Sequence, residues 1–433
     1  MPNQNIFCNV PWYDLHIYWD GSFGICCSED HKIYSESDRQ YNIAQMSIAD
    51  WFNSEPVRAF RTGIQGNQKL SPCRGCYLEE EHGGNSKRLN EIQKSVIFTQ
   101  AFDESYAQSP GRKHFEYNLD GITDTMPIDL HINLGNFCNL ACKMCSREAS
   151  TTIASQEVKW GKIESKKYLG VDWTRNADVW AGFKKQLLSI NGLNNIHFMG
   201  GETLLTDRIE DLVDTMIEHR RFDLCFSFVT NGTVFNPSLL DKLKQFKRVG
   251  IEISIETITE HNAYQRQGTN TPDVLKNIQQ HQTWCNGSSI TITLRPAPSL
   301  LTIGYYYTLL EYALEQQILV KSNLCYSPRF LYAVNLPNTV KQQYAEKYIR
   351  LIDQLNSVNT NDAFNASDPH NFQASVKSEA EMCLGILSTA QPVDAEEQLA
   401  LMVEHCRKWD KIYNLDARLL YPELIDIYNR YGY

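Results

Sequence analysis

The chain has 433 residues, which exceeds one ordinary domain, so we expect two or three packed units. With 42% hydrophobic and 21% charged residues it can bury a large core, which excludes wholesale disorder. The formal net charge of −10 repels polyanions at long range, and no basic patch offsets it. A nucleic-acid partner is therefore not expected.

Residues 1–21 do not have the basic and apolar segments of a signal peptide, and no later window approaches about 18 apolar residues. We therefore expect a cytoplasmic protein without a membrane partner. Thirteen cysteines would be unusual as disulfides in that reducing compartment, so clustered cysteines are interpreted first as metal or cluster ligands. The isolated ones are expected to be buried small apolar residues: Cys225, Cys285, Cys325, Cys383 and Cys406.

The first cysteine group belongs to residues 1–95, which we predict to fold as a small α+β module. Trp12–Tyr18 and Phe23–Cys26 are typical of a β-hairpin that turns at Asp20 and Gly21. The hairpin would bring three cysteines together: Cys8, Cys26 and Cys27.

A further cysteine pair, Cys73 and Cys76, supplies two more thiols to this module. It is preceded by helix-compatible segments at Ser47–Asn53 and Pro56–Thr62 and followed by a polar helical segment at 77–94. Four thiolates make a closed site. Because five cysteines compete for four positions, the sequence leaves open whether it is Cys26 or Cys27 that binds. Residues 96–125 are predicted to be a linker.

The second cysteine group follows a predicted strand at Ile128–Leu134. Cys138, Cys142 and Cys145 lie on the loop that leaves this strand. A cubane iron–sulfur cluster accepts four ligands, so three cysteines leave one iron open to bind another molecule. An iron with an open position indicates a reactive site. The alternative is that the three cysteines bind a structural zinc ion.

Strand-like and helix-like segments alternate along residues 126–332, which predicts an α/β domain with a parallel sheet, in the form of a partial (β/α)6 barrel. Residues 333–433 are predicted to form a mainly helical extension. The later strands are expected at Asn195–Met199, Leu224–Val229, Gly250–Glu256, Ser289–Leu294 and Asn323–Phe330, and the helices at Trp180–Ser189, Asp207–Arg220, Pro237–Phe246, Pro272–Cys285, Ile303–Gln316, Val340–Leu355, Ala395–Tyr413 and Tyr421–Arg430.

Candidate binding residues follow the predicted strands. Ligands of parallel sheets bind outside the carboxyl ends of the strands. The cysteine loop lies at that edge, and so do five further residues: Gly200, Gly201, Glu202, Asn231 and Glu256.

The CxxxCxxC spacing after a first strand, with the motifs that follow it, resembles the signature of the radical SAM superfamily. The resemblance implies that Cys138, Cys142 and Cys145, together with S-adenosylmethionine (SAM), hold a [4Fe–4S] cluster, that SAM is reductively cleaved to a 5′-deoxyadenosyl radical, and that this radical abstracts a substrate hydrogen. It also implies SAM contacts: Glu202 with the ammonium, Arg266 with the carboxylate, Asn231, Ser254 and Glu256 with the ribose, and Met144 with adenine, while Gly200 and Gly201 permit close backbone approach. Each of these has a plain alternative as a turn, a strand end or a surface ion pair.

The N-terminal pattern resembles the twitch module, the short form of the SPASM module. The pattern runs from Cys8 through Pro11-Trp12 and Asp20-Gly21 to the CxxC pair. The resemblance implies a second, auxiliary [4Fe–4S] cluster bound by Cys8, Cys26, Cys73 and Cys76. In relatives the module usually follows the barrel, whereas here it precedes it. A zinc knuckle of four thiolates is the alternative.

These resemblances together predict a radical SAM enzyme that modifies a peptide or protein and takes electrons from a flavodoxin- or ferredoxin-type reductant. A dehydrogenase or isomerase of a small sugar or nucleotide is the second interpretation. A non-catalytic iron–sulfur redox sensor is the third, from another class. Because no motif places a general base or a hydrogen-atom donor, the catalytic residue is unassigned.

Overall fold

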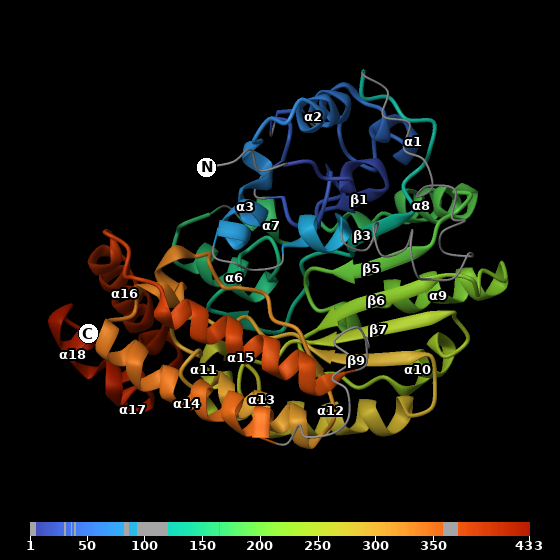
Figure 1. Ribbon diagram of the computed structural model, residues 1–433. Coiled ribbons are helices and arrows are strands. Elements are labelled where there is room, and N and C mark those ends of the chain that lie inside the picture. Colours follow the sequence, from blue (N-terminus) through green and yellow to red (C-terminus); the bar gives the residue numbers. More distant parts are fainter. Residues whose placement is uncertain are drawn as a thin grey trace.

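The computed structural model describes residues 6–29, 32–35, 37–38, 40–81, 86–92, 120–163, 165–357 and 371–433. The predicted linker at 96–125 lies almost entirely outside these residues. At the centre of the protein is an eight-stranded sheet of order β10-β9-β7-β6-β5-β3-β1-β2. The N-terminal segment forms one end of this sheet, and the C-terminal helices lie beside the other end (Figure 1).

Six parallel strands, each followed by helix, form the predicted partial barrel. They are β3 (Asp129–Asn133), β5 (Asn195–Met199), β6 (Cys225–Thr230), β7 (Arg248–Ile253), β9 (Ile290–Leu294) and β10 (Leu319–Val320). The strand predicted at Asn323–Phe330 is wrong, because Leu319 and Val320 pair with β9 instead. The later segment contains Pro328, which has no N–H to give to a ladder.

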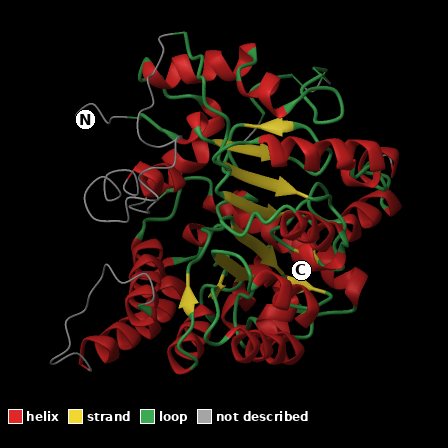
Figure 2. Cartoon of the chain, turned by 90° about the vertical axis from the view of Figure 1, so that its right-hand side faces the viewer, coloured by secondary structure: helices red, strands yellow, loops and turns green. Residues whose placement is uncertain are grey.

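Helices cover the sheet on both sides (Figure 2). Asn176, Asn236 and Asn270 cap three of them by accepting backbone N–H bonds at the helix starts. The helices of the barrel are α6 (Thr151–Lys159), α7 (Ser165–Tyr168), α8 (Ala177–Ser189), α9 (Arg208–Glu218), α10 (Pro237–Leu243), α11 (Glu260–Gln265), α12 (Thr271–Cys285) and α13 (Tyr306–Glu315).

The C-terminal extension is helical, as predicted, and shares its core with the barrel. Its helices are α14 (Asn338–Ser357), α15 (Phe372–Ser388), α16 (Ala395–Tyr413), α17 (Ala417–Leu420) and α18 (Ile425–Arg430). Helix α15 covers the β10 end of the sheet, where Ser375 accepts a hydrogen bond from the Val320 backbone and Glu379 accepts one from Ser322. That edge is therefore closed to another strand.

The two faces of the sheet differ in polarity. Leu130, Ile196 and Phe226 occupy matching positions on neighbouring strands and belong to the main apolar core. Their sequence neighbours His131, His197 and Ser227 are also in register, and alternation places them on the opposite face. Nδ1 of His197 lies 2.7 Å from the hydroxyl of Ser227. The second face therefore carries a polar row.

In its described residues, the N-terminal segment contains the predicted hairpin, formed by β1 (Asp14–Ile17) and β2 (Phe23–Gly24), and several helices, among them α1 (Ile48–Phe52), α2 (Glu55–Gln65) and α3 (Arg74–Glu81). Strand β1 also pairs in parallel with β3. The hairpin thus extends the barrel sheet, a contact that a hairpin pattern cannot predict. In the described part of the chain, no helix is long and apolar enough to cross a membrane.

Candidate functional site

The three-cysteine loop runs from the end of β3 to the start of α6. Cys138 and Cys142 are buried, whereas Cys145 is exposed. Within the loop, β4 (Ala141–Cys142) pairs antiparallel with β8 (Arg266–Gln267). The carbonyl of Cys138 accepts a hydrogen bond of 2.7 Å from Thr152 at the start of α6. The loop is therefore held from two directions.

The sulfur atoms of this loop are surrounded by N–H donors. The backbone N–H of Leu140 and Nδ2 of Asn231 lie 3.4 and 3.9 Å from Sγ of Cys138, and Nη1 of Arg266 lies 3.8 Å from Sγ of Cys142. Burial raises the pKa of Cys138 to about 11, while the donors act to lower it. Coordination to iron would replace the thiol proton, and such donors stabilise thiolate sulfur. The residues present therefore fit a cluster bound through thiolates.

Two glycines bring the end of β5 against the cysteine loop. Gly200 and Gly201 both have positive φ, 76° and 61°. A Cβ on Gly201 would lie 2.6 Å from the carbonyl oxygen of Phe137, the residue before the first cysteine of the motif. The N–H of Glu202 donates to that same oxygen at 2.7 Å. Glycine is required here because only its backbone can approach so closely.

The Glu202 residue is buried, with 2% of its surface exposed, and its carboxylate is hydrogen-bonded to groups at the ends of β5 and β6. It accepts hydrogen bonds from the hydroxyl of Thr230 at 2.6 Å, the N–H of Asn231 at 2.6 Å and the N–H of Leu204 at 3.1 Å. Burial raises the pKa of Glu202, and these bonds oppose the rise. Since a carboxylate offers about four acceptor positions, one further donor can be accommodated.

Arg266 and Glu256, predicted to contact different parts of SAM, are partners of each other. Nη2 and Nε of Arg266 lie 2.7 and 2.8 Å from one carboxylate oxygen, and the other oxygen accepts the N–H of Ala297 at 2.6 Å. The pair uses two of the five N–H donors of Arg266, and Cys142 receives a third. Two donors have no partner among the described residues and remain for a ligand carboxylate.

The remaining two predicted SAM contacts lie beside these residues. Ser254 is buried, and its N–H donates to the carbonyl of Thr230 at 2.8 Å. Sδ of Met144 is 3.5 Å from Nε2 of Gln265. The predicted SAM-binding residues therefore gather around the cysteine loop from four successive strands.

Lys143 lies between the second and third cysteines of the loop, and its sequence neighbours predict no role for it. Its Nζ donates to the carbonyl of Tyr264 at 2.7 Å and lies 3.6 and 5.3 Å from the ring centres of Tyr264 and Trp409. Trp409 belongs to α16, so the C-terminal extension reaches the cysteine loop. No local sequence signal could have indicated this contact.

The N-terminal cysteines Cys8, Cys73 and Cys76 also lie close together. Burial, followed by the nearby charges of Cys73 and Cys76, raises the pKa of Cys8. Cys26 packs with Cys73 against the apolar cluster that contains Cys8. All four predicted auxiliary ligands therefore border one small region of the module.

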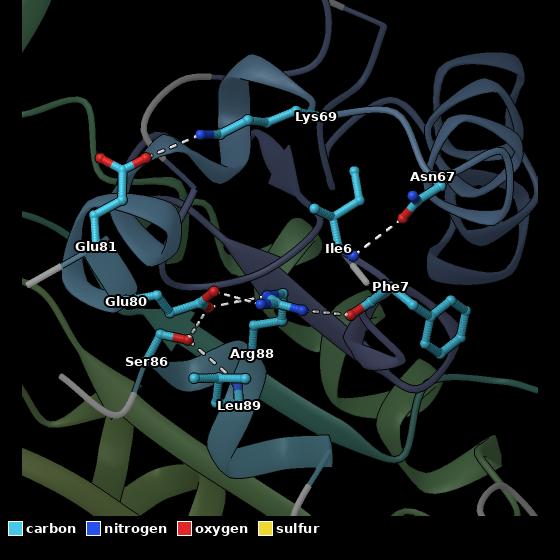
Figure 3. A network of polar contacts seen from close by, with 9 residues as sticks. All are labelled: Ile6, Phe7, Asn67, Lys69, Glu80, Glu81, Ser86, Arg88 and Leu89. Carbon is cyan, nitrogen blue, oxygen red and sulfur yellow. Dashed lines mark hydrogen bonds and ion pairs between the residues drawn. The ribbon is translucent and has the colours of Figure 1, made fainter. Parts of the chain in front are cut away.

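A polar network centred on Arg88 connects the chain beside Cys8 to helix α3, which carries Cys76 (Figure 3). Nη1 of Arg88 donates to the carbonyl of Phe7 at 3.0 Å, next to Cys8. Its Nε donates at 2.9 Å to Glu80, which lies on α3 one turn after Cys76. Arg88 thus sets the distance between two of the predicted ligands.

Cys27 lies near the charges of Lys87 and Asp14, as Cys26 does, but it also lies beside His131 of the sheet. Its sulfur accepts a hydrogen bond of 3.2 Å from Lys87, which also donates to Asp14 at 2.6 Å and lies 3.0 Å from Nε2 of His131. Burial raises the pKa of Cys27, but the charges of His131 and Lys87 outweigh it and lower this pKa to about 6. Cys27 therefore faces the sheet, which favours Cys26 as the cluster ligand.

Among the described residues, no three His, Cys, Asp or Glu side chains converge on a single metal ion. Cluster ligands each bind a different iron, so they need not converge in this way. The five isolated cysteines are all buried, as predicted: Cys225, Cys285, Cys325, Cys383 and Cys406.

Two family models match the chain. Residues 132–284 match the radical SAM superfamily, and residues 8–77 match SPASM, an iron–sulfur cluster-binding domain. The chain therefore contains a part that matches the radical SAM superfamily and, ahead of it, a part that matches the SPASM domain, as the motifs predicted. No curated protein matches the chain.

Several solved structures resemble the chain at low identity. One is anSMEcpe with bound AdoMet and the Cp18Cys peptide, at 17% identity and a TM-score of 0.39, with 53% of this chain and 62% of that chain covered. Another is Streptococcus suis SuiB bound to the precursor peptide SuiA, at 13% identity and a TM-score of 0.37, with coverages of 70% and 64%. This chain thus spans less than two thirds of the length of either.

Proposed function

We propose that this protein is an enzyme that reductively cleaves SAM to a 5′-deoxyadenosyl radical and abstracts a hydrogen atom from a peptide or protein substrate. The observation that carries the proposal is the gathering of the cysteine loop, Glu202, Asn231 and the Arg266–Glu256 pair at the carboxyl ends of successive parallel strands.

In this proposal each residue around the cysteine loop has its own role. Cys138, Cys142 and Cys145 hold a [4Fe–4S] cluster, which supplies the electron for SAM cleavage. Glu202 offers its remaining acceptor position to the SAM ammonium, and Arg266 offers its two free N–H donors to the SAM carboxylate. Asn231, Ser254, Glu256 and Met144 line the space for the ribose and adenine.

The module ahead of the barrel holds an auxiliary [4Fe–4S] cluster through Cys8, Cys26, Cys73 and Cys76. Four cysteines leave no open iron, so this cluster transfers electrons or supports the structure and does not bind substrate directly. A flavodoxin- or ferredoxin-type protein reduces the cluster in the barrel.

The test begins with anaerobic reconstitution, counting of iron and sulfide, and an assay of 5′-deoxyadenosine from SAM with dithionite. About eight irons per chain are expected, falling to about four in the Cys138/Cys142/Cys145→Ala variant, with SAM cleavage lost. Iron without SAM cleavage in the wild type would instead indicate a redox sensor. Zinc without SAM cleavage would indicate a structural scaffold.

A further inference from the structure

A groove of about 1760 Å³ lies between the N-terminal module and the barrel. One part of its lining comes from described residues between 18 and 45, around and after the β1–β2 hairpin, and another from residues between 167 and 179, which precede and begin α8. The lining is completed by Asn133, Glu148 and Ala149. Pairing of β1 with β3 holds the residues that follow β1 beside the end of β3.

The groove borders the proposed site of reaction, because its lining residue Asn133 lies against Gly200. Asn133 is the last residue of β3, and Tyr18 follows directly after β1, so both lie at carboxyl ends of parallel strands. Glu148 and Ala149 come just after Cys145, the last cysteine of the loop. A molecule in the groove would therefore extend from the cysteine loop outward along the module.

The volume favours a long ligand over a small one. Pockets for small molecules enclose about 300 to 1,000 Å³. The groove exceeds that range, so a nucleotide or monosaccharide would leave much of it filled with water. An extended chain would use the whole length.

The lining chemistry is that of a surface that recognises polypeptides. Trp19 and Tyr168 stack with ring centres 5.7 Å apart, and they join the two walls. Aromatic and amide side chains supply large contact area together with adaptable hydrogen bonding. The aromatic residues of the lining are Tyr18, Trp19, Tyr34, Tyr41, Tyr168 and Trp173, and its amides are Gln40, Asn42, Gln45, Asn133 and Asn176.

Charge distinguishes a peptide from a nucleotide. The described lining contains five carboxylates and three basic groups, a formal net charge of −2, to which Glu29 contributes only in part because burial raises its pKa to about 7. The acidic surplus repels phosphate and attracts lysine or arginine side chains. The carboxylates are Asp20, Glu29, Asp38, Glu148 and Asp172, and the basic groups are Lys32, Lys167 and Arg175.

Recognition in the groove must come from side chains. The outer edge of β2 is already covered, because the N–H of Phe23 donates to the carbonyl of Tyr41 and the N–H of Ile43 donates to that of Gly21. A peptide therefore cannot add a strand to this edge.

We propose that the groove binds an extended, net basic polypeptide segment and delivers one of its side chains to the carboxyl end of β3, beside the cysteine loop. The chemical fate of that side chain rests on the proposed function, whereas binding in the groove does not. The proposal therefore restricts the substrate to a net basic polypeptide segment and assigns its path.

The test selects ligands without assuming a sequence. Random linear dodecapeptides displayed on phage are selected on the reconstituted, SAM-bound protein, and the enriched peptides are synthesised for fluorescence anisotropy. We expect peptides that contain Lys or Arg together with apolar residues. Replacing their basic residues by Glu should abolish binding.

Two matched variants locate the site. Ala44 is an exposed residue of the groove lining, so Ala44→Trp narrows the groove without disturbing a core. Ala390 is exposed and outside the groove, so Ala390→Trp adds the same bulk elsewhere. We expect binding to weaken about tenfold or more in the first variant and to be unchanged in the second. Circular dichroism and iron content verify that both variants are folded.

Peptide binding that Ala44→Trp leaves unchanged would overturn the proposal. So would binding of ATP or maltohexaose that Ala44→Trp weakens, because the occupant would then be a nucleotide or an oligosaccharide. Peptide binding in a wild-type protein that fails to cleave SAM would refute the proposed function and leave the groove assignment standing. Cleavage of SAM by a protein that selects no peptide would refute the groove assignment and leave the proposed function standing.

Discussion

Arg266 and Glu256 form a buried ion pair whose guanidinium also lies 3.8 Å from the sulfur of Cys142. Only 11% of the arginine side chain and 0% of the glutamate side chain are exposed. Removing one partner of such a pair leaves a buried charge without compensation. This arrangement connects the stability of the barrel to the cysteine loop.

We therefore expect Glu256→Ala to lower the free energy of unfolding by about 3 to 5 kcal/mol. Arg418→Ala is the control, because it removes an exposed pair with Asp416 and should change little. Urea unfolding of the iron-free proteins provides the comparison. Equal stabilities of the two variants would show that the buried pair does not stabilise the fold.

Cys26 and Cys27 are expected to differ in their effect on iron content. In a Cys138/Cys142/Cys145→Ala background, Cys26→Ala should lose the remaining iron, of about four per chain, and Cys27→Ala should keep it. The reason is that Lys87 holds Cys27 toward the sheet. The measurements are iron analysis and electron paramagnetic resonance of the reduced proteins. Loss of iron in Cys27→Ala but not in Cys26→Ala would make Cys27 the cluster ligand.

Gly201→Ala is expected to destabilise the cysteine loop. The added methyl group would meet the Phe137 carbonyl at 2.6 Å, in a backbone conformation with φ of 61°. Gly161→Ala isolates the conformational cost, because its φ is 69° and nothing lies within 4 Å of the new atom. The melting temperature should fall further for Gly201→Ala than for Gly161→Ala. The iron content of the reconstituted protein should fall only in Gly201→Ala. Equal losses in both variants would indicate backbone strain alone.

The interaction between His131 and Asp14 should make stability depend on pH. Burial lowers the pKa of His131, but the charges of Asp14 and Cys27 raise it to about 10. Its unfolded value is about 6.5, so the stabilisation is complete below pH 6.5 and is lost as pH rises toward 10. Melting temperatures of wild type and His131→Gln, measured from pH 6 to 10, should differ most at pH 6 and converge at high pH. A constant difference would mean that packing, and not charge, is involved.

The sequence by itself determined those features that depend on neighbours along the chain. The spacing of Cys138, Cys142 and Cys145 on one loop and the alternation of strands and helices are local patterns, and the central strands and helices were predicted to within a few residues. The hairpin of β1 and β2 was equally visible, because a tight turn joins its strands. Strand β10 was misplaced because Leu319–Val320 is too short to give a pattern.

Only the tertiary structure decided how distant segments meet. Pairing of β1 with β3 joined the module to the barrel and holds the residues that follow β1, which line the groove, beside the end of β3. The partners of Arg266 and Cys27, and the contact between Lys143 and Trp409, likewise cross long stretches of chain. The physical reason is that burial and hydrogen-bond satisfaction act on whichever groups the packed sheet brings together, whatever their separation in sequence.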